Sequence, residues 1–158
     1  MVFPHWGSNY RWANAGQTSI AHDMIDAGAD LILGHGAHML QEVEFYRGRW
    51  IVYSLGNFMF NTRGRYGRNG APPFSLLASL IHTESDDDIG DVDRTLRLYP
   101  TVTDNLQTGF QSRAVNEQEF RRVERLLTAR SPSQDEFRSR VATARDELGW
   151  YLEMEVAR

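Results

Sequence analysis

Alternating apolar strands and amphipathic helices predict an α/β fold with a mixed sheet for this chain of 158 residues. The first observation is a helical pattern followed by a short apolar run and a glycine-containing loop, an order typical of an α/β unit. The second is that the strands expected beyond residue 74 include pairs joined by turns, which favours antiparallel pairing there. Because the length suits one folding unit, we expect residues 1–158 to form a single domain.

The first third of the chain alternates strand and helix. Residues 16–27 carry one apolar stripe at helical spacing, and Gly28 follows where a C-terminal cap is expected. Residues 30–33 form a short apolar run, which predicts a buried strand. Residues 43–46 and 50–55 are separated by a short turn and predict a hairpin, the second strand being apolar on both faces as in a central strand.

The middle of the chain predicts a loop, a strand, a turn and a second strand. Residues 61–73 are rich in Gly, Arg, Asn and Pro and are expected to form a loop before an apolar strand at 74–81. Residues 84–93 are acidic but lack the ligand spacing of a calcium loop, so we expect a hydrated turn. The strand that follows should turn three side chains inward: Val92, Leu96 and Leu98.

Two capping boxes predict two helices near the C-terminus. Asn116 with Glu119 is expected to start the first helix, and Ser133 with Glu136 the second. The second helix should bury four apolar side chains: Phe137, Val141, Ala144 and Leu148. Residues 150–156 alternate like a final strand.

Composition excludes several kinds of chemistry. Cysteine is absent, so disulfides and thiolate metal sites are excluded. Lysine is absent as well, which excludes Schiff-base catalysis and a P-loop lysine. The net charge of −4 argues against a general nucleic-acid binder. No apolar run approaches the ~20 residues that span a bilayer, and the opening residues lack the basic region of a signal peptide.

Three histidines follow predicted strands. His5 comes after a short apolar stretch, and His35 and His38 come after the strand at 30–33. Ligands of open α/β sheets bind at the carboxyl ends of strands, and imidazole is a good ligand for Zn, Mn or Fe. A loop pair with this spacing also occurs as hydrogen-bonded structure, and the residues alone leave both interpretations open.

Four motifs in a fixed order resemble one protein family. They are His5-Trp6-Gly7 with Tyr10, residues 25–30 (IDAGAD), residues 34–38 (GHGAH) with Gln41 and Glu44, and residues 53–58 (YSLGNF). Together they resemble the C-terminal half of CapA-type capsule and poly-γ-glutamate synthesis proteins, a branch of the calcineurin-like metallophosphatase superfamily. The specific likeness covers residues 2–61.

The resemblance implies a metallophosphatase-like β-sandwich flanked by helices, with a dinuclear site for divalent ions such as Mn, Zn or Fe. His5, His35 and His38 match the histidine ligands of the family's later motifs. The earlier motifs, which supply the carboxylate ligands, are not in this sequence, so we expect a domain truncated at its N-terminus. With imidazoles alone, the chain should bind metal weakly and show little hydrolase activity without the missing half.

Other polar residues are candidates for supporting roles. Glu44 is a candidate to orient a ligand histidine through a hydrogen bond, with a solvent-facing strand residue as the alternative. Asn57 is a candidate to donate to a substrate oxygen, or to stabilise a turn. Three arginines in the glycine-rich loop suit phosphates and carboxylates, or a solvated loop: Arg63, Arg65 and Arg68.

Taken with the resemblance, these residues predict a protein of capsule or poly-γ-glutamate biosynthesis. Its expected substrate is anionic, either a phosphate ester or poly-γ-glutamate, and any activity would be metal-dependent hydrolysis or transfer. The alternative is a non-catalytic accessory subunit that binds a polyanionic polymer or a synthase partner. The resemblance also implies a location in the bacterial cell envelope, which no segment of this sequence specifies by itself.

Overall fold

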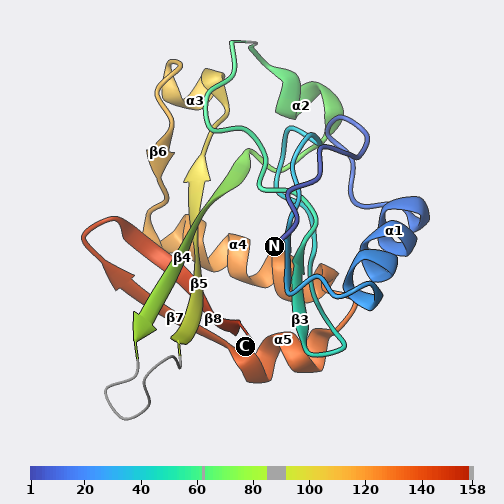
Figure 1. Cartoon of the computed structure of the whole chain (residues 1–158). Coiled ribbons are helices and arrows are strands. Elements are labelled where there is room, and N and C mark those ends of the chain that lie inside the picture. The colour runs from blue at the N-terminus through green and yellow to red at the C-terminus, as the bar shows by residue number, and fades with distance from the viewer. Residues whose placement is uncertain (62, 85–91, 157–158) are drawn as a thin grey trace.

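The computed structural model describes residues 1–61, 63–84 and 92–156, which form two β-sheets and the helices packed against them (Figure 1). The expected acidic turn falls mostly on residues 85–91, which lie outside the described residues. No described helix has the length and apolar character needed to cross a membrane. The α/β prediction is confirmed, with one mixed and one antiparallel sheet. The likeness to a metallophosphatase sandwich stays a prediction.

The first sheet contains three strands in the order β1-β3-β2. β1 (Leu31–Leu33) pairs in parallel with β3 (Arg49–Val52), and β2 (Val43–Tyr46) pairs antiparallel with β3, as the predicted hairpin requires. Bridges from Val2 to Ile32 and from His5 to His35 place residues 2–5 parallel to β1 on its other side. Three parallel stretches therefore end at the same edge of the sheet.

Helix α1 (Ala15–Asp26) covers one face of the first sheet (Figure 1). It starts at Asn14, whose side chain accepts from the backbone N–H of Gln17 in a capping box. Two buried side chains of the helix, Ala21 and Ile25, pack on one face of the sheet. That face contributes three buried side chains to the cluster: Ile32, Ile51 and Tyr53. The opposite face of β1 and β3 belongs to the main core, so the predicted burial of the central strand on both faces is confirmed.

The second sheet is antiparallel, in the order β4-β5-β8-β7. Its strands are β4 (Phe74–Glu84), β5 (Val92–Val102), β7 (Val141–Asp146) and β8 (Gly149–Val156), and the short β6 (Arg113–Ala114) pairs with β5. Two short helices, α2 (Arg65–Asn69) and α3 (Asn105–Thr108), were not predicted. The inner face of β5 carries Leu96 and Leu98, both fully buried as expected.

Helix α4 (Glu117–Arg130) contributes to the core shared by the two sheets. Its capping box between Asn116 and Glu119 is present as predicted. The guanidinium of Arg130 at its last turn donates to the buried Glu42 from Nε and Nη2, at 2.9 and 2.8 Å. Glu42 also accepts from the backbone N–H of Ala13 at 3.0 Å, and Arg130 lies 4.0 Å above the ring centroid of Trp12. One carboxylate therefore joins α4 to the segment that precedes α1.

The prediction for the second C-terminal helix is wrong in two respects. Helix α5 (Gln134–Arg140) ends at Arg140, and the residues expected to continue it form β7. Pairing with β8 outweighs the helical spacing, and Leu148 lies exposed beside the connecting turn. Ser133 does not cap the helix through its side chain, because its hydroxyl accepts from the N–H of Phe45 in β2 at 2.7 Å.

Gly34 lies where three backbone segments meet at the end of β1. A methyl group added there would lie 2.2 Å from the carbonyl oxygen of Tyr53 and 2.5 Å from Nε1 of Trp6. These are the two atoms of the hydrogen bond from the indole to that carbonyl, which is 2.7 Å long. The position therefore has no room for a side chain.

We expect Gly34→Ala to lower the free energy of unfolding by about 1–3 kcal/mol, because a backbone carbonyl cannot move aside as a flexible side chain can. Urea denaturation followed by circular dichroism measures the change. Gly67→Ala in α2 is the control, since a methyl group there meets no atom within 4 Å. Equal stability of Gly34→Ala and the wild type would contradict this description of the strand end.

Candidate functional site

The candidate site lies at the edge where the three parallel stretches of the first sheet end. His5 ends the stretch beside β1, His35 follows β1, and the segment after β3 leads to Asn57. Backbone hydrogen bonds hold this edge in register, from Trp6 N–H to the His35 carbonyl and from Leu55 N–H to the Gly34 carbonyl. Ligands of open α/β sheets bind at such carboxyl ends.

His5 and His35 form a direct pair. Their Nδ1 atoms are 3.1 Å apart, and their rings meet edge to face with centroids 4.7 Å apart. Burial, followed by the charge of His5, lowers the pKa of His35 and favours its neutral form. Gly36, with φ of +112°, allows this approach, because a methyl group there would lie 2.6 Å from the Trp6 carbonyl oxygen.

The spacing of this pair suits two ligands of one metal ion. Nitrogens bound at about 2.1 Å lie about 3.0–3.4 Å apart for bond angles between 90° and the tetrahedral value. The 3.1 Å between the Nδ1 atoms of His5 and His35 falls in that range. Neutral imidazole is the form that ligates, so the low pKa of His35 fits the same role. The pair therefore fits half of a metal site.

His38 belongs to a neighbouring cluster. Its Nδ1 lies 2.8 Å from Oδ1 of Asn57, so the ring donates there and Nε2 is the nitrogen that can accept a proton or bind a ligand. The ring stacks on Tyr10 with centroids 5.5 Å apart and contacts Phe60 at 4.6 Å. The structure thus places Asn57 as the partner that orients a predicted ligand histidine, the role proposed from sequence for Glu44.

Tyr10 is a member of the site whose role the sequence left open. It is 5% exposed, and its hydroxyl has no hydrogen-bond partner among the described residues. Burial, and then the neighbouring Tyr66, raise the pKa of Tyr10, whereas Asn57 and nearby arginines act in the opposite direction. Tyr10 and His38 both have left-handed backbone, with φ of 56° and 64°, and such strain clusters at functional sites.

Tyr66, in α2, connects the cluster to the second sheet. Its hydroxyl donates to the His38 carbonyl at 2.9 Å, lies 2.7 Å from the hydroxyl of Thr103, and contacts the Asn57 amide at 3.5 Å. Sequence analysis missed it, because it lies in a segment expected to be an irregular loop. A buried tyrosine ring meets Tyr10 edge to face here, at 5.3 Å.

The three predicted arginines flank the cluster on α2 and the turn before it. Arg65 and Arg68 are exposed and close enough to Tyr10 to lower its pKa through their charge. Arg68 donates to two backbone carbonyls of its own segment, and Arg63 lies 5.3 Å from the ring centroid of Phe110. None of the three forms an ion pair with a carboxylate of the described residues.

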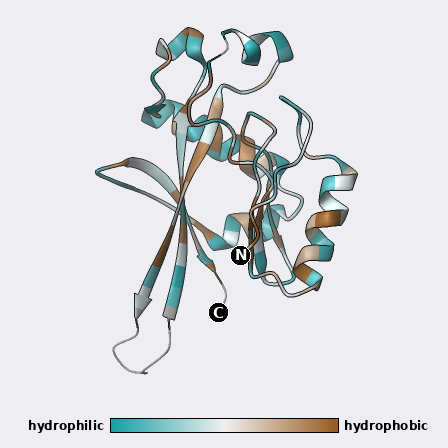
Figure 2. Cartoon of the chain, turned by 45° about the horizontal axis from the view of Figure 1, so that its top comes forward, coloured by the Kyte–Doolittle hydropathy of each residue, from teal (hydrophilic) through white to brown (hydrophobic). Residues whose placement is uncertain are grey.

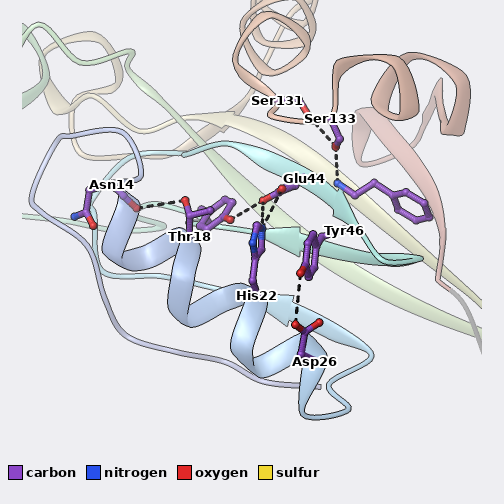
Figure 3. A network of polar contacts seen from close by, with 10 residues as sticks. Asn14, Thr18, His22, Asp26, Glu44, Tyr46, Ser131 and Ser133 are labelled. Atoms are coloured by element: carbon purple, nitrogen blue, oxygen red, sulfur yellow. Dashed lines mark hydrogen bonds and ion pairs between the residues drawn. The ribbon is translucent and has the colours of Figure 1, made fainter.

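Glu44 contacts none of the three candidate histidines, and neither sequence interpretation describes it. Its side chain lies on the α1 face of the sheet, where Tyr53 donates to it at 2.6 Å and Nε2 of His22 lies 3.1 Å away (Figure 3). Burial and the bond to Glu44 raise the pKa of Tyr53 well above its usual range, which keeps its proton on the hydroxyl. Figure 3 also shows two separate hydrogen bonds nearby, from the Thr18 hydroxyl to the Asn14 carbonyl and from the Tyr46 hydroxyl to Asp26.

The structure therefore joins His5 to His35 and His38 to Asn57. Within the described part of the chain, no group of three or more His, Asp or Glu side chains is arranged to hold a metal ion. The site contains one imidazole pair, one oriented imidazole and two buried tyrosines, and exposed arginines without an ion-pair partner among the described carboxylates flank it. Such a set can bind an anion and supply neutral nitrogen ligands to an ion.

Comparison with known proteins agrees with these motifs. Residues 1–62 match the family described as bacterial capsule synthesis protein PGA_cap. The chain is 48% identical over 94 residues to the PGA biosynthesis protein CapA of Bacillus subtilis, an alignment that covers 52% of this chain and 25% of that protein. It is 45% identical over 62 residues to the capsule biosynthesis protein CapA of Bacillus anthracis, covering 39% of this chain and 15% of that protein.

A third relative is a probable polyglutamine synthesis accessory protein of Mycobacterium tuberculosis, 42% identical over 65 residues, or 40% of this chain and 17% of that protein. The chain thus spans a quarter or less of the length of these curated relatives. The matched region contains His5, His35, His38 and Asn57. Residues 1–62 are therefore similar in sequence to CapA-type bacterial capsule synthesis proteins.

Proposed function

We propose that this protein acts in capsule or poly-γ-glutamate biosynthesis by binding an anionic substrate at the strand-end site, with a divalent ion at the histidine pair. The observation that supports this most is the 3.1 Å approach of two imidazole nitrogens beside an oriented third imidazole. The substrate class is a phosphate ester or a glutamate polymer.

His5 and His35 would hold the ion as neutral ligands, and His38 is a further candidate through its free Nε2. A bound divalent ion polarises a phosphoryl oxygen or activates a water molecule. Asn57 fixes the ring of His38 by accepting from Nδ1, as partners of ligand histidines commonly do. Tyr66 fixes the same segment through the His38 carbonyl.

The anion itself would be bound by the guanidinium groups of α2. Arg65 and Arg68 have no carboxylate partner among the described residues, so their charge is available to a ligand. Guanidinium groups bind phosphates and carboxylates through paired N–H donors. The same residues suit either substrate class, so the choice between them is left to measurement.

A second candidate function is that of a non-catalytic accessory subunit that binds a polyanion or a synthase partner. Two observations favour it. The described residues contain no complete metal-ligand group, and one relative is named an accessory protein. In this alternative the arginines act alone and the histidine pair is structural.

We expect the chain to bind a single Mn²⁺ or Zn²⁺ ion weakly, and His35→Ala to reduce that affinity by at least about tenfold, because it removes one of two paired ligands. Isothermal titration calorimetry measures both values. His82→Ala is the control, since His82 lies exposed on β4 away from the pair. Equal affinity of the wild type and His35→Ala would contradict the metal assignment.

We expect the double variant Arg65→Gln/Arg68→Gln to bind poly-γ-glutamate or a phosphate ester about tenfold more weakly than the wild type, since two exposed charge contacts are lost. Binding should also weaken as salt rises. The matched control is Arg125→Gln/Arg138→Gln, which removes two exposed arginines of α4 and α5. An equal loss of affinity in the control would mean that binding depends only on the net charge of the protein, which would contradict the assignment of Arg65 and Arg68.

These two measurements separate the two candidate functions. Binding of an anionic substrate that requires a divalent ion and weakens in His35→Ala would support the metal-dependent site. Polyanion binding that is unchanged by His35→Ala and by a chelator would support the accessory subunit.

A further inference from the structure

Half of the large apolar side chains that are exposed in the described part of the chain gather at one end of the molecule. Five of ten such residues lie there, and we call them the apolar tip: Phe58, Met59, Phe60, Leu106 and Phe110. Phe58, Met59 and Leu106 are 64%, 76% and 63% exposed. Figure 1 shows that α2, α3 and the loop before α2 form this end, and Figure 2 shows hydrophobic segments among hydrophilic ones there. Exposed apolar side chains grouped in this way mark interaction sites.

Hydrogen bonds hold the segments of the apolar tip side by side. The hydroxyl of Ser112 donates to the carbonyl of Phe58, and the side-chain amide of Asn105 donates to the carbonyl of Phe60. These bonds join residues about 50 positions apart in the sequence. The apolar tip is therefore formed by two chain segments that the fold brings together.

The surroundings of the apolar tip are cationic, although the whole chain has a net charge of −4. Arg63, Arg65 and Arg68 follow the loop directly, and none pairs with a carboxylate of the described residues. Arg63 lies over the ring of Phe110, with Cζ 5.3 Å from the centroid. The nearby carboxylate of Asp104 is buried and accepts from the first turn of α3. Positive charge therefore borders exposed apolar side chains.

We propose that the apolar tip docks onto the surface of an anionic phospholipid bilayer. Aromatic and aliphatic side chains insert into the interfacial region, while arginines beside them contact acidic headgroups. A soluble polyanion would use the arginines but gain nothing from exposed Phe58 and Met59. Phe58, Met59 and Phe60 lie on the loop before α2, and exposed loop side chains can enter a deformable lipid surface. This proposal does not depend on the metal site, and of the three arginines its test changes Arg63 alone because Arg65 and Arg68 also belong to the proposed anion site.

Sedimentation with vesicles tests the proposal. The wild-type chain is mixed with vesicles of phosphatidylcholine alone or with 30% phosphatidylserine, about one acidic lipid in three, at low salt. We expect binding to the acidic vesicles only. Phe58→Ser/Met59→Ser should weaken it by about tenfold or more, and Arg63→Gln by about fivefold.

Matched controls distinguish vesicle binding through the apolar tip from non-specific binding by other exposed residues. Leu148→Ser removes a residue that is 60% exposed in the β7–β8 turn, and Arg138→Gln removes an exposed arginine of α5. Both should bind vesicles like the wild type, and all variants should keep the wild-type circular dichroism spectrum and melting temperature. Three results would overturn the proposal: no binding to acidic vesicles, equal losses in the controls, or a wild-type dimer in light scattering that Phe58→Ser/Met59→Ser converts to a monomer.

Discussion

Parallel pairing on both sides of β1 is the constraint on which the candidate site depends. Residues 2–5 lie along one side of β1 and β3 along the other, so three chain segments end at a single edge. The backbone has to pass closely there, which is why glycine occupies positions 34 and 36. The same close approach of the backbone segments brings the imidazole of His5 into contact with that of His35. The chemistry of the site thus follows from the strand pairing.

The sequence predicted structure well where the deciding contacts are local. The capping box of α4 and the hairpin of β2 and β3 are satisfied by residues a few positions apart. The predictions from sequence failed where a residue or strand far away along the chain binds the same backbone or side-chain group. Residues 141–146 have helical apolar spacing, yet pair with β8, and the hydroxyl of Ser133 bonds to β2, 88 positions away. A single sequence does not contain those competing energies.

The same difference between local and distant contacts applies to the candidate site. The sequence predicted His5, His35 and His38 as one set at strand ends; the structure pairs His5 with His35, whereas His38 pairs with Asn57. The role of Glu44 was not predictable, because its partners depend on which face of the sheet its side chain occupies. In the structure it lies on the face that α1 covers, where it contacts His22 and Tyr53. Tyr66 belongs to the cluster only because a short helix inside an apparent loop places its hydroxyl between the His38 carbonyl and Thr103, which follows β5. Such contacts depend on how the two sheets pack.

The ion pair between Arg130 and Glu42 has a consequence for how the protein can be divided. Residues 1–62 match the capsule synthesis family, but the carboxylate that holds the Trp12–Ala13 segment is itself held by the end of α4. Removing α4 would leave that buried acid without its counter-charge and free the segment that leads from His5 to α1. The segment that matches the family model therefore depends on a helix outside it. The strand-end histidines lie in the matched segment, whereas α4 holds the chain that follows His5.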